Sequence, residues 1–146
     1  MKLSTKGRYG LRALIDLAVH SQEGHVPLAK IAERQGLSEI YLEQVFAALR
    51  KSGIVKSVKG AQGGYLLAAP PAKVTVGDIL RVLEGELTVV DGEDRMEKGT
   101  IAGTVRKLVW DKMDERINRY VDGITLEALV EEHKKINYQD FLMYYI

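Results

Sequence analysis

The sequence predicts a mainly α-helical fold with one small β-hairpin, and three observations support this prediction. Apolar residues recur every three or four positions along most of the chain, which is the spacing of an amphipathic helix. Only Ile54–Val58 and Tyr65–Leu67 are typical of strands, and the glycine-rich segment 60–64 between them favours a tight turn. Of the 146 residues, 46% are hydrophobic and 28% are charged, a balance typical of a folded globular protein.

Three helices are expected before the hairpin, over residues 4–20, 28–35 and 38–51. Ser4 and Ser38 are candidate caps, because a serine hydroxyl can accept hydrogen bonds from the free amides of a first helical turn. Gly36 separates the second and third helices and can adopt the left-handed conformation that ends a helix. The third helix therefore follows the second after a tight turn.

Beyond the hairpin, the pattern predicts a helix over Val74–Leu83 that Thr75 can cap and Gly85 ends. An acidic linker over residues 85–99 separates the first domain, residues 1–84, from the rest. Residues 100–136 are expected to form a long amphipathic helix to about Tyr120 and a short helix over Thr125–Lys135. An aromatic tail covers residues 137–146.

The net charge of +1 conceals two halves of opposite sign. Residues 1–73 hold 11 Lys and Arg against 5 Asp and Glu, whereas residues 74–146 hold 10 against 15. A basic half of this kind is expected to face a polyanion. The chain has no cysteine, no histidine-centred triad is evident, and His20, His25 and His133 lack metal-ligand spacing. We therefore expect no cofactor, no metal site and no enzymatic activity.

Two short helices, a glycine-containing turn and a glycine-tipped hairpin together indicate a winged helix-turn-helix. In this fold the second of the two helices enters the DNA major groove, and here its apolar stripe turns the opposite face outward. That outer face carries Ile40, Glu43, Gln44, Ala47 and Lys51, with Tyr41 on its flank. Cations at the hairpin and at the start of the first helix can contact phosphates, namely Lys56, Lys59, Lys6, Arg8 and Arg12.

Each of these groups also has a plainer interpretation. Glu43 and Gln44 are also typical of an ordinary solvated helix face, and the glycines of residues 60–64 are also typical of a simple hairpin. A nucleotide-phosphate loop is disfavoured, because the glycine-rich segment lacks both the Gly-Lys-Ser/Thr ending and the strand-loop-helix setting of such loops. The positive charge of the first half favours DNA binding.

Several motifs occur in the order typical of one family. They are Leu3–Leu11, Ile31–Glu33, Tyr41–Gln44, Leu49–Gly53 and Gly60–Tyr65. On these residues the chain resembles the winged-helix regulators that include IscR, NsrR and CymR, from Met1 to about Tyr120. The resemblance implies a homodimeric repressor that binds a double-stranded DNA operator, with DNA contacts at Ser38, Ile40, Tyr41, Glu43 and Gln44 and, in the wing, at Lys59 and Gly60. Many members have arginine at the position of Lys59, which leaves minor-groove insertion there an open question.

The resemblance also implies that the long helix pairs with its counterpart in a second copy. The residues expected at this dimer interface are Ile101, Val105, Leu108, Val109, Met113 and Ile117. Cluster-binding members carry three cysteines before this helix, whereas this chain has the acidic stretch 91–99 there. Carboxylates can bind a hard cation in principle, but this stretch lacks a recognisable binding loop, so we expect a solvated acidic loop.

The cysteine-free branch of the family that this chain resembles is CymR, a repressor of sulfur and cysteine metabolism. That resemblance extends to the aromatic tail and implies cysteine synthase (O-acetylserine sulfhydrylase) as a partner, bound through Tyr144, Tyr145 and Ile146. An extended end offers an apolar anchor and a free carboxylate, which oriented amides can capture. The alternative is a tail that packs on its own dimer, since exposed apolar residues are unfavourable in water.

We therefore expect a DNA-binding transcription repressor of cysteine or sulfur genes. Two alternatives remain open at this point: a module that acts chiefly by docking its tail into a metabolic enzyme, and a cluster-free regulator of another set of genes. No apolar run is long enough to cross a membrane, and Met1–Lys6 lacks the apolar stretch of a secretory signal. A cytoplasmic location without membrane contact is expected.

Overall fold

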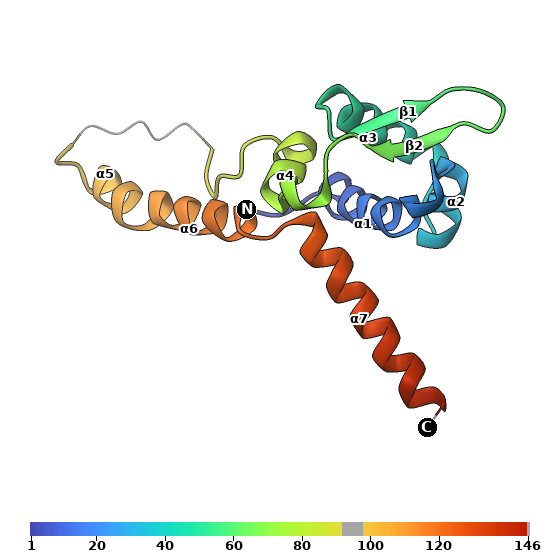
Figure 1. Cartoon of the computed structure of the whole chain (residues 1–146). Helices are drawn as coiled ribbons and strands as arrows, with labels where there is room; N and C mark the ends of the chain where they lie inside the picture. The colour runs from blue at the N-terminus through green and yellow to red at the C-terminus, as the bar shows by residue number, and fades with distance from the viewer. Residues whose placement is uncertain (92–97, 146) are drawn as a thin grey trace.

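A computed structural model describes residues 1–91 and 98–145 and confirms the mainly helical, winged helix-turn-helix fold (Figure 1). Its elements are α1 (Thr5–His20), the 3-10 turn η1 (Ser21–Glu23), α2 (Leu28–Gln35), α3 (Glu39–Lys51), β1 (Val55–Val58), β2 (Gly64–Leu67), the 3-10 turn η2 (Pro71–Lys73), α4 (Val76–Glu84), α5 (Ile101–Val105), the π-helical turn η3 (Arg106–Trp110), α6 (Asp111–Asp122) and α7 (Leu126–Tyr145). In Figure 1, α1 to α4 and the hairpin form one body, from which α6 and α7 extend in different directions.

The core lies between α1, α3 and α4, and the apolar stripe of α3 fills much of it. The members of that stripe, Leu42, Val45, Phe46 and Leu49, are buried as the sequence predicts. The ring of Phe46 meets Tyr65 of β2 edge-on, with 4.9 Å between the ring centroids. Because buried aromatic pairs add to the stability of a core, this contact ties the hairpin to α3.

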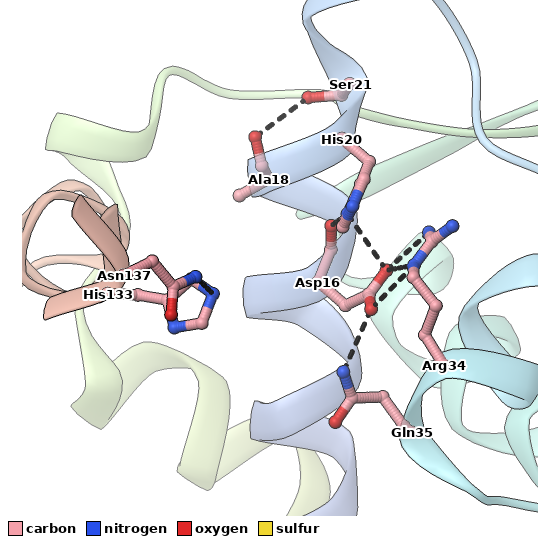
Figure 2. Close-up of polar contacts among 8 residues, drawn as sticks. All are labelled: Asp16, Ala18, His20, Ser21, Arg34, Gln35, His133 and Asn137. Atoms are coloured by element: carbon pink, nitrogen blue, oxygen red, sulfur yellow. Dashed lines mark hydrogen bonds and ion pairs between the residues drawn. The ribbon is translucent and has the colours of Figure 1, made fainter. Parts of the chain in front are cut away.

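A buried carboxylate joins α1 to α2 (Figure 2). The side chain of Asp16 is 2% exposed, and its two oxygens accept from Nε and Nη2 of Arg34 at 2.7–3.2 Å and from Nε2 of Gln35 at 2.9 Å. The hydrogen bond with Asp16 raises the pKa of Arg34 above its ordinary value. Both partners lie in the last turn of α2, so this ion pair fixes the end of α2 against α1.

The helix ends follow the predicted caps with one exception. Ser38 accepts from the amide of Tyr41, Thr75 forms a capping box with Asp78, and Gly36 has the left-handed φ of 65°. The prediction that the Ser4 hydroxyl caps α1 is wrong. That hydroxyl instead donates to Glu84 at 2.6 Å.

Glu84 takes over the role of a cap for α1. Its Oε1 accepts from the Ser4 hydroxyl, from the Ser4 amide at 2.9 Å and from the Gly7 amide at 3.0 Å. A carboxylate at a helix N-terminus satisfies free amides and complements the helix dipole. The last residue of α4 therefore holds the first turn of α1.

The hairpin is antiparallel, with Val55 opposite Leu67 and Val58 opposite Gly64. Its strands differ from the predicted ranges by one residue each, at Ile54 and Gly64. Val26, just before α2, adds a bridge to β2 through two backbone hydrogen bonds of 2.9 Å with Tyr65. The hairpin is thus attached to the segment that leads into α2.

The helix predicted over residues 100–120 is interrupted. A π-helical turn, η3, separates α5 from α6, and the three elements together form an arm over residues 101–122. The sequence pattern did not predict the π-helical turn, because its apolar spacing is compatible with an ordinary α-helix. Arg106 and Asp111, at the two ends of η3, lie 3.6 Å apart as an ion pair.

Polar residues one turn apart attach α6 to the body. Asp114 accepts from the amide of Val89 at 2.8 Å, and Asn118 donates to the carbonyl of Leu87 at 3.0 Å. Asp122 pairs with Arg81 of α4 at 2.8 Å, and hydrogen bonds from Arg81 lower the pKa of this carboxyl. Leu87 is itself buried, so the first part of the expected linker packs with the fold.

Gly77 leaves room for the ion pair between α4 and the arm. A side chain at this position would collide with Asp122 and crowd Arg81. Glycine therefore permits the α4–α6 contact that these two charged residues make.

The last helix is longer than predicted. Instead of a short helix over Thr125–Lys135 and an extended tail, α7 runs without a break from Leu126 to Tyr145. Residues 136–145 include no proline or glycine that would end the helix. The predicted end was placed where the amphipathic pattern fades, and it fades here because apolar residues occur on several sides of the helix. The prediction of an extended end is wrong through Tyr145, and Ile146 lies outside the described residues.

The Asp16 contact predicts the stability of one variant. Replacing Asp16 with alanine removes four hydrogen bonds to α2, so we expect the free energy of unfolding to fall by about 2–3 kcal/mol. Urea denaturation followed by circular dichroism measures this change. Glu33→Ala is the control, because Glu33 forms an exposed pair with Lys30 and its loss should change stability by less than about 1 kcal/mol.

Candidate nucleic-acid interface

The outer face of α3 is exposed where the sequence predicts DNA contacts. Ile40 is 71% exposed, and Glu43, Gln44, Ala47 and Lys51 are also exposed. Their side chains leave the helix opposite the buried stripe, so a flat or convex partner can reach all of them together. Amide, carboxylate and methyl groups of this kind can read the edges of bases in a major groove.

Tyr41, on the flank of this face, is half-buried in a cluster that the sequence analysis did not anticipate. Its ring meets Tyr9 of α1 edge-on at 6.3 Å, and its hydroxyl donates to Thr5 at 3.4 Å. The guanidinium groups of Arg8 and Arg12 lie 5.6 and 5.2 Å from the centre of the Tyr9 ring. These cation–π contacts hold the arginines beside α3.

The candidate phosphate contacts at α1 divide into two groups. Arg12 donates from Nη2 to the carbonyl of Gln35 at 2.7 Å, so part of its guanidinium stabilises the end of α2. Lys6 and Arg8 are exposed near the start of α1, and Arg8 lies beside the Tyr9 ring that contacts Tyr41. No local sequence signal indicated this cluster, because Tyr41 lies 36 residues after Thr5, to which its hydroxyl donates.

The hairpin forms the other wall of a groove beside α3. Residues of both elements line this groove, among them Glu43, Ala47, Arg50, Lys59 and Gly60. Lys59 and Gly60 are exposed at the hairpin tip, where Gly60 has a φ of 121° that favours glycine. The groove thus brings together Glu43 and Ala47 of the predicted helix face and Lys59 and Gly60 of the predicted wing, whereas Ile40, Gln44 and Lys51 do not line it.

The candidate metal ligands do not gather. Among the described residues, no three His, Asp or Glu side chains lie close enough to hold a metal ion. Each histidine instead has a hydrogen-bond partner: His20 bonds the backbone oxygen of Asp16, His25 that of Gln62, and His133 the side chain of Asn137. Residues 92–97 of the acidic stretch, where a cation loop was considered, lie outside the described residues.

The arm carries an exposed apolar face, which we call the arm face. It contains the residues predicted at a dimer interface, Ile101, Val105, Leu108, Val109, Met113 and Ile117. Leu108 is 63% exposed, and Ile117 is the member that is half-buried. A second apolar surface lies on the outer half of α7, at Ile136, Tyr138, Phe141, Leu142, Met143 and Tyr144.

The chain matches a known protein family over most of its length. The model of the Rrf2 family, described as an iron-dependent transcriptional regulator, matches residues 3–132. The chain belongs to the Rrf2 family of transcriptional regulators. This membership confirms the predicted winged-helix regulator and the prediction that the chain is not an enzyme.

Relatives within the family include regulators with two different names. The transcriptional regulator IscR of Aliivibrio salmonicida is 42% identical over 136 residues, which cover 92% of this chain and 80% of that protein. Among solved structures, CymR, the global cysteine regulator of B. subtilis, matches with a TM-score of 0.78 and 42% identity over 90% of this chain and 98% of that one. The IscR of T. potens matches with a TM-score of 0.74 and 49% identity, over 93% and 90%.

The comparisons therefore do not separate the IscR branch from the CymR branch. Both names occur among relatives at 40–49% identity that cover most of the chain. None of the described helices is long and apolar enough to span a membrane.

Proposed function

We propose that this regulator binds operator DNA as a homodimer and represses transcription. The observation that carries the proposal is the concave surface between α3 and the hairpin, where Glu43 and Ala47 face Lys59 and Gly60. A winged helix-turn-helix presents such a surface to adjacent major and minor grooves. Because its ligand is the chromosome, the protein would act in the cytoplasm.

Each side chain has a role that its chemistry supports. Gln44 can make a bidentate contact with adenine, Glu43 can accept from the amino group of cytosine, and Ile40 can touch a thymine methyl. Ser38 and Tyr41 stand at the start of α3, where a serine hydroxyl that accepts from an amide can still donate to a phosphate. Lys6, Arg8 and Lys51 add the cationic phosphate contacts that supply most of the affinity.

The wing contributes differently from α3. Lys59 keeps the positive charge of the arginine found in many family members but lacks the planar guanidinium fork, so it favours contact with phosphates over reading of bases. Gly60 beside it has no side chain and lets the backbone approach the nucleic acid closely.

This assignment predicts opposite effects for two variants. Gln44→Ala should relax base preference at one position of an operator selected from random duplexes, at a cost of about 1–3 kcal/mol for that base pair. Lys59→Ala should weaken binding to every sequence equally and reduce the salt dependence by about one counterion. Fluorescence anisotropy at several salt concentrations measures both effects.

A matched control uses Lys112→Ala, which removes an exposed charge in the first turn of α6, outside α3 and the hairpin. It should leave affinity and salt slope as in the unmodified protein. Affinity that does not change with salt in the unmodified protein would contradict the DNA-binding role itself.

We infer that the arm face pairs with the same face of a second copy. The apolar side chains of the arm face are unfavourable in water where they are exposed. Such a face fits the self-complementary contact of a two-fold dimer. Replacing Leu108 and Met113 together with glutamate should give monomers in sedimentation velocity. It should also weaken operator binding, because a dimer that contacts DNA through two recognition helices binds more tightly than a monomer. Lys107→Glu, exposed on the same arm, should leave the dimer intact.

For the regulated genes, we propose cysteine and sulfur metabolism. The absence of cysteine and the similarity to the B. subtilis global cysteine regulator support this choice, since that chain aligns over 98% of its length. The alternative is a cluster-free regulator of another set of genes, which the similarity to IscR proteins supports. Operators mapped across the genome beside sulfur-assimilation genes would support the first, and operators elsewhere would support the second.

We also propose cysteine synthase as a partner that modulates DNA binding through the end of α7, with Tyr144, Tyr145 and Ile146 as the contacts. Tyr144 is 83% exposed, which supports an accessible end. Deleting residues 144–146 should abolish capture of purified cysteine synthase while operator binding by the regulator alone is retained. Equal capture by the truncated chain would contradict this role, and capture without any operator binding would favour the alternative of an enzyme-docking module.

A further inference from the structure

The hairpin tip extends beyond the paired strands and has little backbone support of its own. Beyond the Val58–Gly64 pair, the tip is closed by one turn, in which the carbonyl of Gly60 accepts from the amide of Gly63 at 3.0 Å. Of the proposed wing contacts, Gly60 begins this turn and Lys59 directly precedes it. Their position therefore depends on whatever holds the tip.

The base of the hairpin, in contrast, is firmly attached. Val26 and Tyr65 exchange two backbone hydrogen bonds of 2.9 Å. Gly64 lies so close to the carbonyl of Val26 that a side chain there would collide with the backbone. These contacts fix the start of β2 against the segment before α2, but they stop short of the tip.

We propose that His25 is a positioning residue for DNA binding, because its imidazole holds the hairpin tip. Nε2 of His25 donates to the backbone carbonyl of Gln62, one of the two residues in the turn between Gly60 and Gly63. A carbonyl oxygen can only accept, so Nε2 carries the hydrogen. His25 directly precedes Val26, and the attachment of the hairpin therefore continues from its base into its tip.

The expected benefit is preorganisation. A tip that is ordered before binding loses less conformational freedom when Lys59 meets the DNA, and the affinity rises accordingly. This inference rests on the proposed wing contact, and it adds a residue outside the recognition helix and the wing themselves. The sequence pattern of an isolated histidine after Gly24 did not indicate such a role.

The test compares three single variants with the unmodified full-length chain. His25→Ala removes the donor, His25→Gln supplies an amide donor of similar reach, and Gln22→Ala is an exposed control in the same connection. Anisotropy with a duplex selected from a random pool gives the affinity. Amide order parameters of Ala61 and Gly63 in the free protein report directly on the tip.

We expect His25→Ala to weaken binding about 3- to 10-fold, the usual consequence of losing one hydrogen bond, and to lower the order parameters at the tip. His25→Gln should recover both values to within about twofold, and Gln22→Ala should change neither. The proposal is overturned if His25→Ala leaves the tip ordered, or if His25→Gln is as weak as His25→Ala. Failure of the unmodified chain to bind any duplex would contradict the proposed function instead, and the order parameters would still test the contact.

Discussion

The buried carboxylate of Asp16 is the interaction on which the DNA-reading half depends. It ties the middle of α1 to the last turn of α2 through Arg34 and Gln35, and the tight turn at Gly36 then leads directly into α3. The position of α2 is therefore fixed relative to α1, and the turn at Gly36 leads from this fixed helix into α3. A buried carboxylate tolerates few arrangements of its partners, because each lost hydrogen bond leaves an unsatisfied oxygen. The contacts of Asp16 therefore restrict how α1 and α2 can pack.

Both ends of the body are secured in the same way, by polar contacts between elements distant in sequence. Glu84 satisfies the first amides of α1, and Arg81, on the same helix, binds Asp122 on the arm. One helix, α4, thus holds the beginning of α1 and the end of the arm at once. The exposed apolar surfaces of the arm and of α7 lie outside this framework, where a partner can cover them without disturbing it.

Local signals were sufficient to predict the body. Gly36, Ser38 and Thr75 act within four residues of the helix ends that they define, and the apolar stripe of α3 matches its burial. Signals that depend on distant partners were missed. The link from Ser4 to Glu84 spans 80 residues, and the bond from His25 to Gln62 spans 37, so no short pattern records either. The end of α7 was missed because a helix without stop residues continues where amphipathic periodicity fades.

The glycine at position 77 contributes to the attachment of the arm to α4. The Asp122 carboxylate occupies the space where a side chain at position 77 would lie, so this glycine leaves room for the Arg81–Asp122 ion pair against α4. In the proposed two-fold assembly, the attachment of the arm would set how far apart the two recognition helices stand, and successive major grooves on one side of a duplex recur about every 10.5 base pairs. The absence of a side chain at position 77 thus preserves one of the contacts that attach the arm to the body.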